Sequence, residues 1–442
     1  MGEGDRRRSR AQSEGETRMI DVTKYLKENK ELSDYRINEV KNESYEAFFV
    51  HRKLETVRAT DYTDVSVTVY KDHDGKKGES SFSVYASTTE SELKGKIASA
   101  AKRAELVFNE PYEIPDGGKA ETDAPSNIKE YEPEELAAKV AEAVYAADNY
   151  EDGSINAVEI FIYKKKTTVK NSKGVDKSET GYEIMIEAIP TWNEGGESVE
   201  LYEAYRTSEF DSAAITAEID GKMKEVRDRK HAVKPEKIGD VKVILKPKEI
   251  SELISELAAD ADYATAYSHS NVKNVGDCWQ NNPTGDKLTV TARGAVKGSV
   301  YSATFDADGT SLKDKKIICG GKVVGRYGSN RFAQYLGEEA TGNLRCFEVE
   351  KGSLTEEEIK KQPYIECISL SGLQLDLYND YIGGEIRLAY YFDGEKIVPV
   401  TGISMSGRLS NVLETLKATD KIVTERNFRG PDKIMLAGME IL

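Results

Sequence analysis

The C-terminal part of the chain, from Lys287 onward, consists largely of short β-strand patterns separated by glycine-containing turns. The strand segments read KLTVTA, KIICGGKVVGRY, CFEVEKG, CISLSG, EIRLAYYFDGEKIVPV and KIMLAGMEIL. Closely spaced antiparallel strands of this kind close into a barrel or pack as a sandwich. One helical stretch, residues 409–419, interrupts them. We therefore predict a β-rich C-terminal domain over residues 237–442, mainly antiparallel and β-barrel-like or sandwich-like.

The preceding half mixes strand and helix patterns. Residues 64–70 (DVSVTVY) and 81–85 (SFSVY) alternate apolar and polar side chains, and a polar loop with glycine joins them as a hairpin. A helix is expected over residues 90–106, with Thr88 or Thr89 as its N-cap. Two strands followed by a helix indicate an α+β layer. The fold class predicted for the whole chain is α+β, with an α/β-layered N-terminal half.

A second block of the same kind follows. It contains an expected helix over residues 133–147, strands over 157–163, 165–170 and 183–190, a turn over 171–174, one strand over 198–206 and a helix over 213–230. Residues 115–133 are rich in Pro, Gly and Asp and are expected to form a linker or surface crossing. We predict one N-terminal region over residues 19–236, with sub-blocks 19–116 and 133–236.

Charge and composition exclude several classes of protein. Lys plus Arg number 62 and Asp plus Glu 78, so the formal net charge is −16, which disfavours direct binding to a nucleic acid. No apolar run is long enough for a membrane helix. Residues 1–18 have no apolar signal region and are expected to be a disordered leader, with Met19 the more natural start of the fold. Four scattered cysteines favour a reduced, cytoplasmic protein.

The residues do not assemble a familiar catalytic or metal motif. The cysteines form no CxxC pair, and the four histidines lack ligand spacing, so no cofactor is predicted. Asp306, Asp308 and Gly309 begin like a calcium loop, but Thr310, Ser311 and Ile317 stand where ligands and glycine are needed, so a tight turn is expected. Ser369 lies outside a GxSxG motif, and no histidine is placed to act as its base.

Several ordered segments resemble a known family. They are an apolar strand ending in proline (residues 243–247), a helix (248–260), a D-x-D-G turn (306–310), an I-x-x-G-x-V-x-x-x-Y strand pair (318–327) and an A-x-x-L-G-x-x-x-T-G-N segment (333–343). Residues 371–416 and Gly430–Pro431 agree with the end of the same pattern. More loosely, so do LETVRA (54–59) and VKNSKGV (169–175). In this order the segments resemble the TldD/PmbA family, which is named for modulators of DNA gyrase.

The resemblance implies a dimer with an α/β N-terminal half and a β-barrel-like C-terminal half. In this family the TldD kind of subunit carries HExxxH on the helix after the apolar strand, together with a late cysteine, and binds a catalytic metal for peptide hydrolysis. The PmbA (TldE) kind lacks these ligands and serves as the partner. Aligned on Pro247, the HExxxH positions fall on Ser255, Glu256 and Asp260, so Glu256 is kept and both histidines are missing.

The function expected from this resemblance is a PmbA/TldE-like, non-catalytic subunit of a TldD-type metallopeptidase system that acts on unfolded peptides or small proteins. Its partner would be a TldD-like subunit or a second copy of itself. A serine hydroxyl does not replace imidazole on zinc, and Glu256 and Asp260 are read as solvated helix charges. Two alternatives stay open: an active peptidase with a divergent or metal-independent site that uses Glu256, Asp260 or a cysteine, and a stand-alone homodimeric peptide-binding protein.

Overall fold

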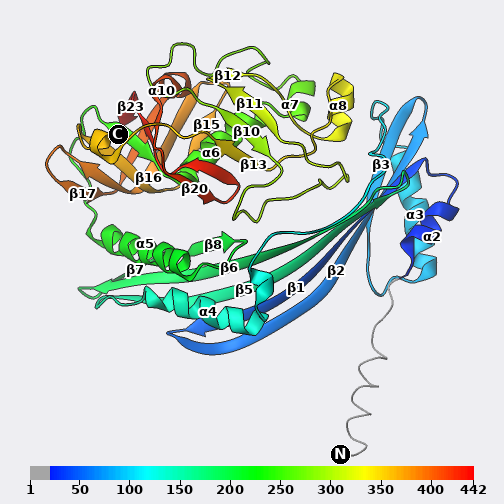
Figure 1. Cartoon of the computed structure of the whole chain (residues 1–442), viewed down its shortest axis with the longest axis horizontal. Helices are drawn as coiled ribbons and strands as arrows, with labels where there is room; N and C mark the ends of the chain where they lie inside the picture. The colour runs from blue at the N-terminus through cyan, green and yellow to red at the C-terminus, as the bar shows by residue number, and fades with distance from the viewer. Residues whose placement is uncertain (1–19) are drawn as a thin grey trace, which may run out of the picture.

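The computed structural model describes residues 20–442, so the leader expected over residues 1–18 lies outside the described residues. Two bodies of structure follow one another along the chain (Figure 1). The N-terminal half builds a long, curved β-sheet with helices packed on it, and the C-terminal half is a β-rich unit that sits above the sheet (Figure 1). The fold class is α+β, as predicted.

The N-terminal sheet has eight strands in the order β3-β2-β1-β5-β6-β4, with β7 and β8 also paired to β6. Its strands are β1 (Asp34–Val50), β2 (Lys53–His73), β3 (Lys76–Val84), β4 (Lys119–Asp123), β5 (Gly153–Asn171), β6 (Asp176–Glu194), β7 (Glu197–Glu200) and β8 (Glu203–Thr207). All neighbours are antiparallel except β4 and β6. Because β1 pairs with β5, strands from both expected sub-blocks form one continuous sheet.

The strand predictions were too short in several places. β1 was missed, and β2 begins at Lys53 instead of residue 64, because residues 53–59 are exposed on both faces and show no apolar alternation. The expected strands 157–163 and 165–170 are one strand, β5. The expected strand 198–206 is two, β7 and β8, which are separated at Leu201 and Tyr202.

The expected linker over residues 115–133 was wrong in part. It contains β4, which pairs in parallel with β6 from Lys119↔Asp176 to Asp123↔Thr180, and a short 3-10 helix, η1 (Ile128–Glu130). β4 lies at the edge of the sheet, where backbone hydrogen bonds and the ion pair between Glu121 and Lys166 hold it without apolar side chains. An edge strand of this kind gives no hydrophobic signal in the sequence.

The described N-terminal half has four α-helices, of which the first was not predicted and the other three lie where the sequence predicted them. They are α2 (Val22–Glu28), α3 (Glu90–Ala104), α4 (Pro133–Ala146) and α5 (Ser212–His231). Thr89, rather than Thr88, caps α3, and Glu92 completes a capping box. Helix α3 buries Leu93 and Ile97 against β2 and β3, while α4 and α5 share a second core with β5 and β6.

The C-terminal half contains two sheets. The first has the order β12-β11-β10-β13-β21-β20, and the second β19-β22-β9-β14-β16-β18-β23, with β15 and β17 also on β16. The strands are β9 (Lys242–Leu245), β10 (Val290–Arg293), β11 (Lys315–Cys319), β12 (Lys322–Val323), β13 (Cys346–Val349), β14 (Tyr364–Leu370), β15 (Gln374–Asp376), β16 (Tyr381–Phe392), β17 (Ile397–Val400), β18 (Ile403–Arg408), β19 (Lys417–Ala418), β20 (Ile422–Glu425), β21 (Phe428–Pro431), β22 (Ile434–Leu436) and β23 (Met439–Ile441). Most pairs are antiparallel, and β9–β14 and β13–β21 are parallel.

One hydrophobic core joins these two sheets, which gives the sandwich-like arrangement. Five helices accompany the strands: α6 (Pro247–Ala259), α7 (Tyr263–Tyr267), α8 (Asn330–Leu336), α9 (Glu356–Ile359) and α10 (Leu409–Thr415). Helices α6 and α10 contribute Leu253, Ile254 and Leu413 to the core between the sheets. Helix α10 lies in the helical stretch predicted over residues 409–419, but it ends earlier, at Thr415. Across residues 20–442, no helix has both the length and the apolar character needed to cross a membrane.

Candidate functional site

The site indicated by the family resemblance lies on helix α6. Strand β9 ends at Leu245, and Pro247 opens the helix at a position where its fixed φ angle suits the first turn. Ile250, Leu253, Ile254 and Leu257 form the buried face, at the spacing of an α-helix. This face fixes the rotation of the helix and leaves Ser255 half-buried and Glu256 exposed.

Asp260 forms the C-cap of α6 and is 5% exposed. Its two carboxylate oxygens accept hydrogen bonds from the backbone N–H groups of Val272 (2.5 Å) and Lys273 (2.9 Å). The interpretation of Asp260 as a solvated helix charge is therefore wrong: the loop after α7 folds back and uses this carboxylate as an anchor. A carboxylate engaged in this way has a structural role whether or not it has another.

The residues around α6 do not fit a zinc ion. A serine hydroxyl occupies one histidine position, and both oxygens of Asp260 are already bonded to backbone at the other. Within residues 20–442, no three His, Cys, Asp or Glu side chains are grouped so that they could hold a metal ion. The four histidines lie far apart in the fold; His73 bonds to the Val107 carbonyl (3.0 Å) and His231 to Glu194 (2.8 Å).

The four cysteines differ in their exposure. Cys346 and Cys367 are buried, and burial raises the pKa of both thiols above the ordinary value. Cys367 contacts Met405 (3.9 Å between the sulfurs). Cys278 is half-buried and Cys319 is exposed on the strand turn after β11. No histidine hydrogen bond activates any of these thiols in the described part of the chain, so they have no general base.

A cluster of carboxylates, missed in the sequence, lies where α5 and β8 meet α6 and β20. We call it the junction cluster: Glu203, Glu218, Lys222, Glu225, Glu249 and Glu425. Lys222 pairs with Glu203 (3.0 Å) and with Glu225 (3.1 Å). Burial lowers the pKa of Lys222, but the carboxylates of Glu225 and Glu203 outweigh burial and hold it above the ordinary value. The cluster was invisible in the sequence because its members come from four separate elements.

Two members of the junction cluster have strongly raised pKa values. Burial, with a small contribution from Glu252, raises the pKa of Glu249 to about 7; this side chain is 2% exposed, and one of its carboxylate oxygens has no hydrogen-bond partner among the described residues. Burial and the nearby Glu218 and Glu203 raise the pKa of Glu425 to about 7. Carboxylates with such values exchange protons near neutral pH, which is the property required of a general acid or base.

The D-x-D-G turn joins the two halves of the molecule. The buried Asp306 accepts from the backbone N–H groups of Asp308 (3.0 Å), Thr310 (3.0 Å) and Asn343 (3.1 Å). These three bonds make the tight turn, and Asp308 then reaches across to form an ion pair with Arg36 of β1. Asp306 therefore joins the D-x-D-G motif to Asn343, the last residue of the A-x-x-L-G-x-x-x-T-G-N motif. Through Asp308 the same turn acts as a clamp between the N-terminal sheet and the C-terminal half.

Next to this clamp the two halves enclose a cavity of about 240 Å³. Tyr70 and Tyr112 of the N-terminal half and Phe332 of α8 contribute aromatic walls, while Arg331 pairs with Glu79 (3.2 Å) across the boundary. The Arg36–Asp308 and Arg331–Glu79 pairs satisfy most of the charge in the cavity. We interpret it as part of the contact between the two halves.

Comparison with known proteins agrees with the fold and the motifs. Residues 238–442 match the family described as PmbA/TldA metallopeptidase C-terminal domain. The solved structure of TldE from Thermococcus kodakarensis superposes with a TM-score of 0.76 at 16% identity, over 95% of this chain and 98% of that one. Residues 238–442 therefore match a PmbA/TldA metallopeptidase C-terminal domain, and the chain as a whole has the fold of that TldE structure. No curated protein matches it.

Two further solved structures have the same fold. A putative modulator of DNA gyrase from Thermotoga maritima MSB8 gives a TM-score of 0.73 at 13% identity, over 92% of this chain and 96% of that one. A second, from Bacteroides thetaiotaomicron VPI-5482, gives 0.74 at 15% identity, over 95% and 97%. Because these likenesses extend over nearly the full length of each chain, the long sheet and the β-rich half are a shared architecture.

Proposed function

We propose that this chain is a PmbA/TldE-like, non-catalytic subunit of a TldD-type metallopeptidase system that acts on unfolded peptides or small proteins in the cytoplasm. The observation that carries the proposal is the state of helix α6. Ser255 and Asp260 occupy the positions where the TldD kind has histidines, and Asp260 is committed to the backbone of Val272 and Lys273. Glu256, the one motif residue that is kept, is exposed and has no metal ligands beside it within residues 20–442.

The N-terminal sheet supports a role in assembly or peptide capture. Strand β3 covers β2 only from Val65 to His73, so the outer edge of β2 from Lys53 to Asp64 pairs with no strand among the described residues. Leu54, Val57 and Tyr62 on this segment are about half exposed (50%, 48% and 52%). An open edge with exposed apolar side chains accepts an added strand, from a partner subunit or from an extended peptide.

Metal analysis combined with a casein digestion assay tests this proposal. We expect the purified chain to contain no stoichiometric zinc and to leave casein intact, and to gain activity only when it is mixed with a TldD-like chain that carries HExxxH. Co-purification with such a chain, encoded near this gene, would support the heteromeric assembly. Stoichiometric zinc together with cleavage that a chelator abolishes would refute the non-catalytic role.

The junction cluster favours one alternative, a peptidase that works without a metal. Burial raises the pKa values of both Glu249 and Glu425 to about 7, so each can donate or accept a proton near neutral pH. Cleavage by the purified chain that persists in chelator, and that is lost in both Glu249→Gln and Glu425→Gln, would establish this function. Retained cleavage in both variants would exclude the junction cluster as its source.

The third possibility is a stand-alone homodimeric peptide-binding protein. It predicts a stable dimer of this chain alone, measured by light scattering, that binds unfolded casein without cleaving it and is unchanged by a TldD-like chain. Direct contact with DNA is not part of any of these proposals, because a net charge of −16 opposes it.

A further inference from the structure

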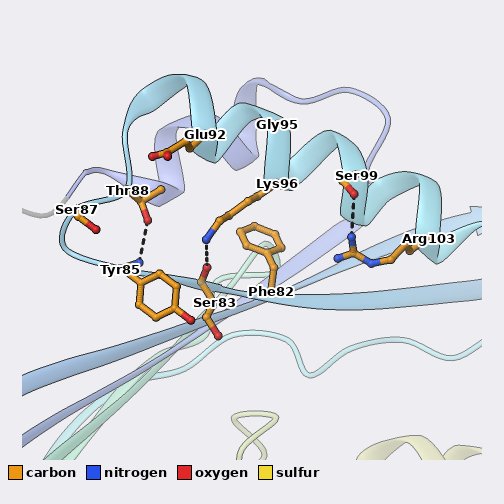
Figure 2. A pocket seen from close by; sticks show the side chains of 10 residues that line it. All are labelled: Phe82, Ser83, Tyr85, Ser87, Thr88, Glu92, Gly95, Lys96, Ser99 and Arg103. Carbon is orange, nitrogen blue, oxygen red and sulfur yellow. Dashed lines mark hydrogen bonds between the residues drawn. The ribbon is translucent and has the colours of Figure 1, made fainter.

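A groove of about 550 Å³ runs between strand β3 and helix α3. Figure 2 shows its walls: Phe82, Ser83 and Tyr85 come from the strand and its exit, and Gly95, Lys96, Ser99 and Arg103 come from the helix. It lies at the opposite end of the long sheet from α5 and the junction cluster (Figure 1). The open edge of β3, the hydrogen-bond donors of the wall and Gly95 together indicate a ligand for this groove, independently of the proposed peptidase partner.

Strand β3 is the edge of its sheet, and its outer side is open at the groove. Near its start Lys77 pairs with Asn109, but from Ser80 to Val84 β3 pairs only with β2 in the described structure. The carbonyls of Ser81 and Ser83 point away from β2, since they accept from Arg103 (3.3 Å) and Lys96 (2.7 Å) on α3. In an antiparallel strand the N–H and C=O of one residue point to the same side, so the N–H groups of Ser81 and Ser83 also face the groove.

The groove therefore presents backbone and cationic donors, beside serine and threonine hydroxyls that can both donate and accept. The Ser81 and Ser83 N–H groups have no acceptor within residues 20–442, and Lys96 keeps donors beyond the one it gives to Ser83. Among the described residues that line the groove, Glu92 alone has a carboxylate, and it accepts from the N–H of the N-cap Thr89 (2.8 Å). An occupant that satisfies such a wall must supply carbonyl and carboxylate oxygens.

Glycine at the centre of α3 keeps the groove open. Glycine inside a helix costs about 0.5–1 kcal/mol relative to alanine, so its place there requires a reason. A Cβ added at Gly95 would meet no atom within 4 Å, which shows that the absence of a side chain is not needed for packing within the described fold. Its consequence is space beside Phe82 and the exposed Tyr85, whose ring lies 4.9 Å from Lys96 Nζ.

We propose that the β3–α3 groove binds an extended, acidic peptide segment of another protein. The segment adds as a further strand to the edge of β3, its carbonyls accept from the Ser81 and Ser83 N–H groups, and its carboxylates pair with Lys96 and Arg103. Charge complementarity selects this occupant: the groove has two cations and one committed carboxylate, in a chain whose net charge is −16. Apolar side chains of the segment contact Phe82 and Tyr85.

The competing explanation is that Lys96 and Arg103 only shield the edge from unwanted strands. Charged side chains on an edge commonly have that role. Shielding predicts that no peptide binds, and that removal of both charges promotes self-association of the chain. The two explanations therefore differ in a measurable way.

The test is selection from a display library of random linear seven-residue peptides on the full chain, with the Gly95→Trp variant as the counter-target. A Cβ at residue 95 meets no atom within 4 Å, so the backbone there accepts a side chain, and the bulk of tryptophan should occupy the groove; circular dichroism checks that the variant is folded. We expect enriched peptides to contain Asp or Glu alternating with β-branched residues. Labelled with fluorescein, they should bind the parent chain with an affinity that falls as salt rises.

Matched variants then locate the binding. Gly95→Trp and the double charge reversal Lys96→Glu with Arg103→Glu should each weaken binding by about tenfold or more. Ser83→Pro, which removes one edge N–H, should weaken it by about fivefold. Ser91→Trp, on the same helix outside the groove, should bind like the parent. The proposal would be overturned if no peptide were enriched, if the enriched peptides lacked acidic residues, or if enrichment were equal on Gly95→Trp. A change of oligomeric state in Gly95→Trp would also overturn it, because it would identify a second copy of the chain as the occupant.

Discussion

At the scale of single residues, burial decides which carboxylates of α6 matter. Glu256 is exposed, whereas Asp260, one turn further on, closes two backbone hydrogen bonds in a buried position. We expect Asp260→Ala to lower the free energy of unfolding by about 2–3 kcal/mol, because the N–H groups of Val272 and Lys273 lose a charged acceptor. Glu256→Ala is the matched control and should change stability by less than about 0.5 kcal/mol. Urea unfolding followed by tryptophan fluorescence measures both, and equal stability of the two variants would contradict the anchor role.

A second residue-scale prediction concerns pH. Burial raises the pKa of Glu249 from 4.5 to about 7, so between these values the folded chain holds a proton that the unfolded chain has released. Stability from this group is therefore fully present below pH 4.5, falls as pH rises, and is lost above about pH 7. The neutral variant Glu249→Gln should be more stable than the parent at pH 8, by up to roughly 3 kcal/mol, and close to it at pH 4.5. Unfolding curves at several pH values measure the difference; a difference independent of pH would contradict it.

At the scale of elements, the sequence predicts helices that have apolar periodicity and capping residues, and it misses strands that are formed mainly by backbone pairing. Helices α3, α4 and α5 were placed within a few residues, because each repeats apolar side chains along one face. The start of β2 and all of β4 were missed, because backbone hydrogen bonds to neighbouring strands form them. The same reason hid the junction cluster, since its glutamates converge only after α5, α6 and β20 have packed.

The capping box of α3 gives the element-scale prediction. Thr89 accepts from the N–H of Glu92 (3.3 Å), and the Glu92 carboxylate returns a bond to the N–H of Thr89 (2.8 Å). Thr89→Ala should destabilise the chain by about 1 kcal/mol, since the N–H of Glu92 loses its side-chain acceptor at the start of the helix. Ser91→Ala, an exposed neighbour in the first turn, should have little effect. Thermal unfolding compares the two, and an equal Tm for both variants would mean that the cap does not hold the helix.

At the scale of the whole molecule, one turn couples the two halves. Gly309 has φ +88°, and a Cβ there would lie 2.7 Å from a methyl group of Val175, in the turn between β5 and β6 of the N-terminal sheet. Gly174 has nearly the same backbone angle, φ +91°, but a Cβ there meets nothing within 4 Å. Comparing substitutions at these two glycines therefore separates the cost of backbone strain from the cost of disturbing the contact between the two halves.

We expect Gly174→Ala to cost about 1 kcal/mol, from strain alone, and Gly309→Ala to cost at least about 1 kcal/mol more. The extra cost arises because the D-x-D-G turn must retreat from Val175, which also pulls Asp308 away from Arg36. Limited proteolysis should then cut Gly309→Ala between the halves faster than Gly174→Ala, in addition to the difference in urea unfolding. Equal costs would show that the sheet yields at Val175 and that the turn does not set the fit of the two halves. A larger loss of stability in Gly309→Ala would show that the contact between the D-x-D-G turn and Val175 determines how the β-rich half, including α6, packs on the long sheet.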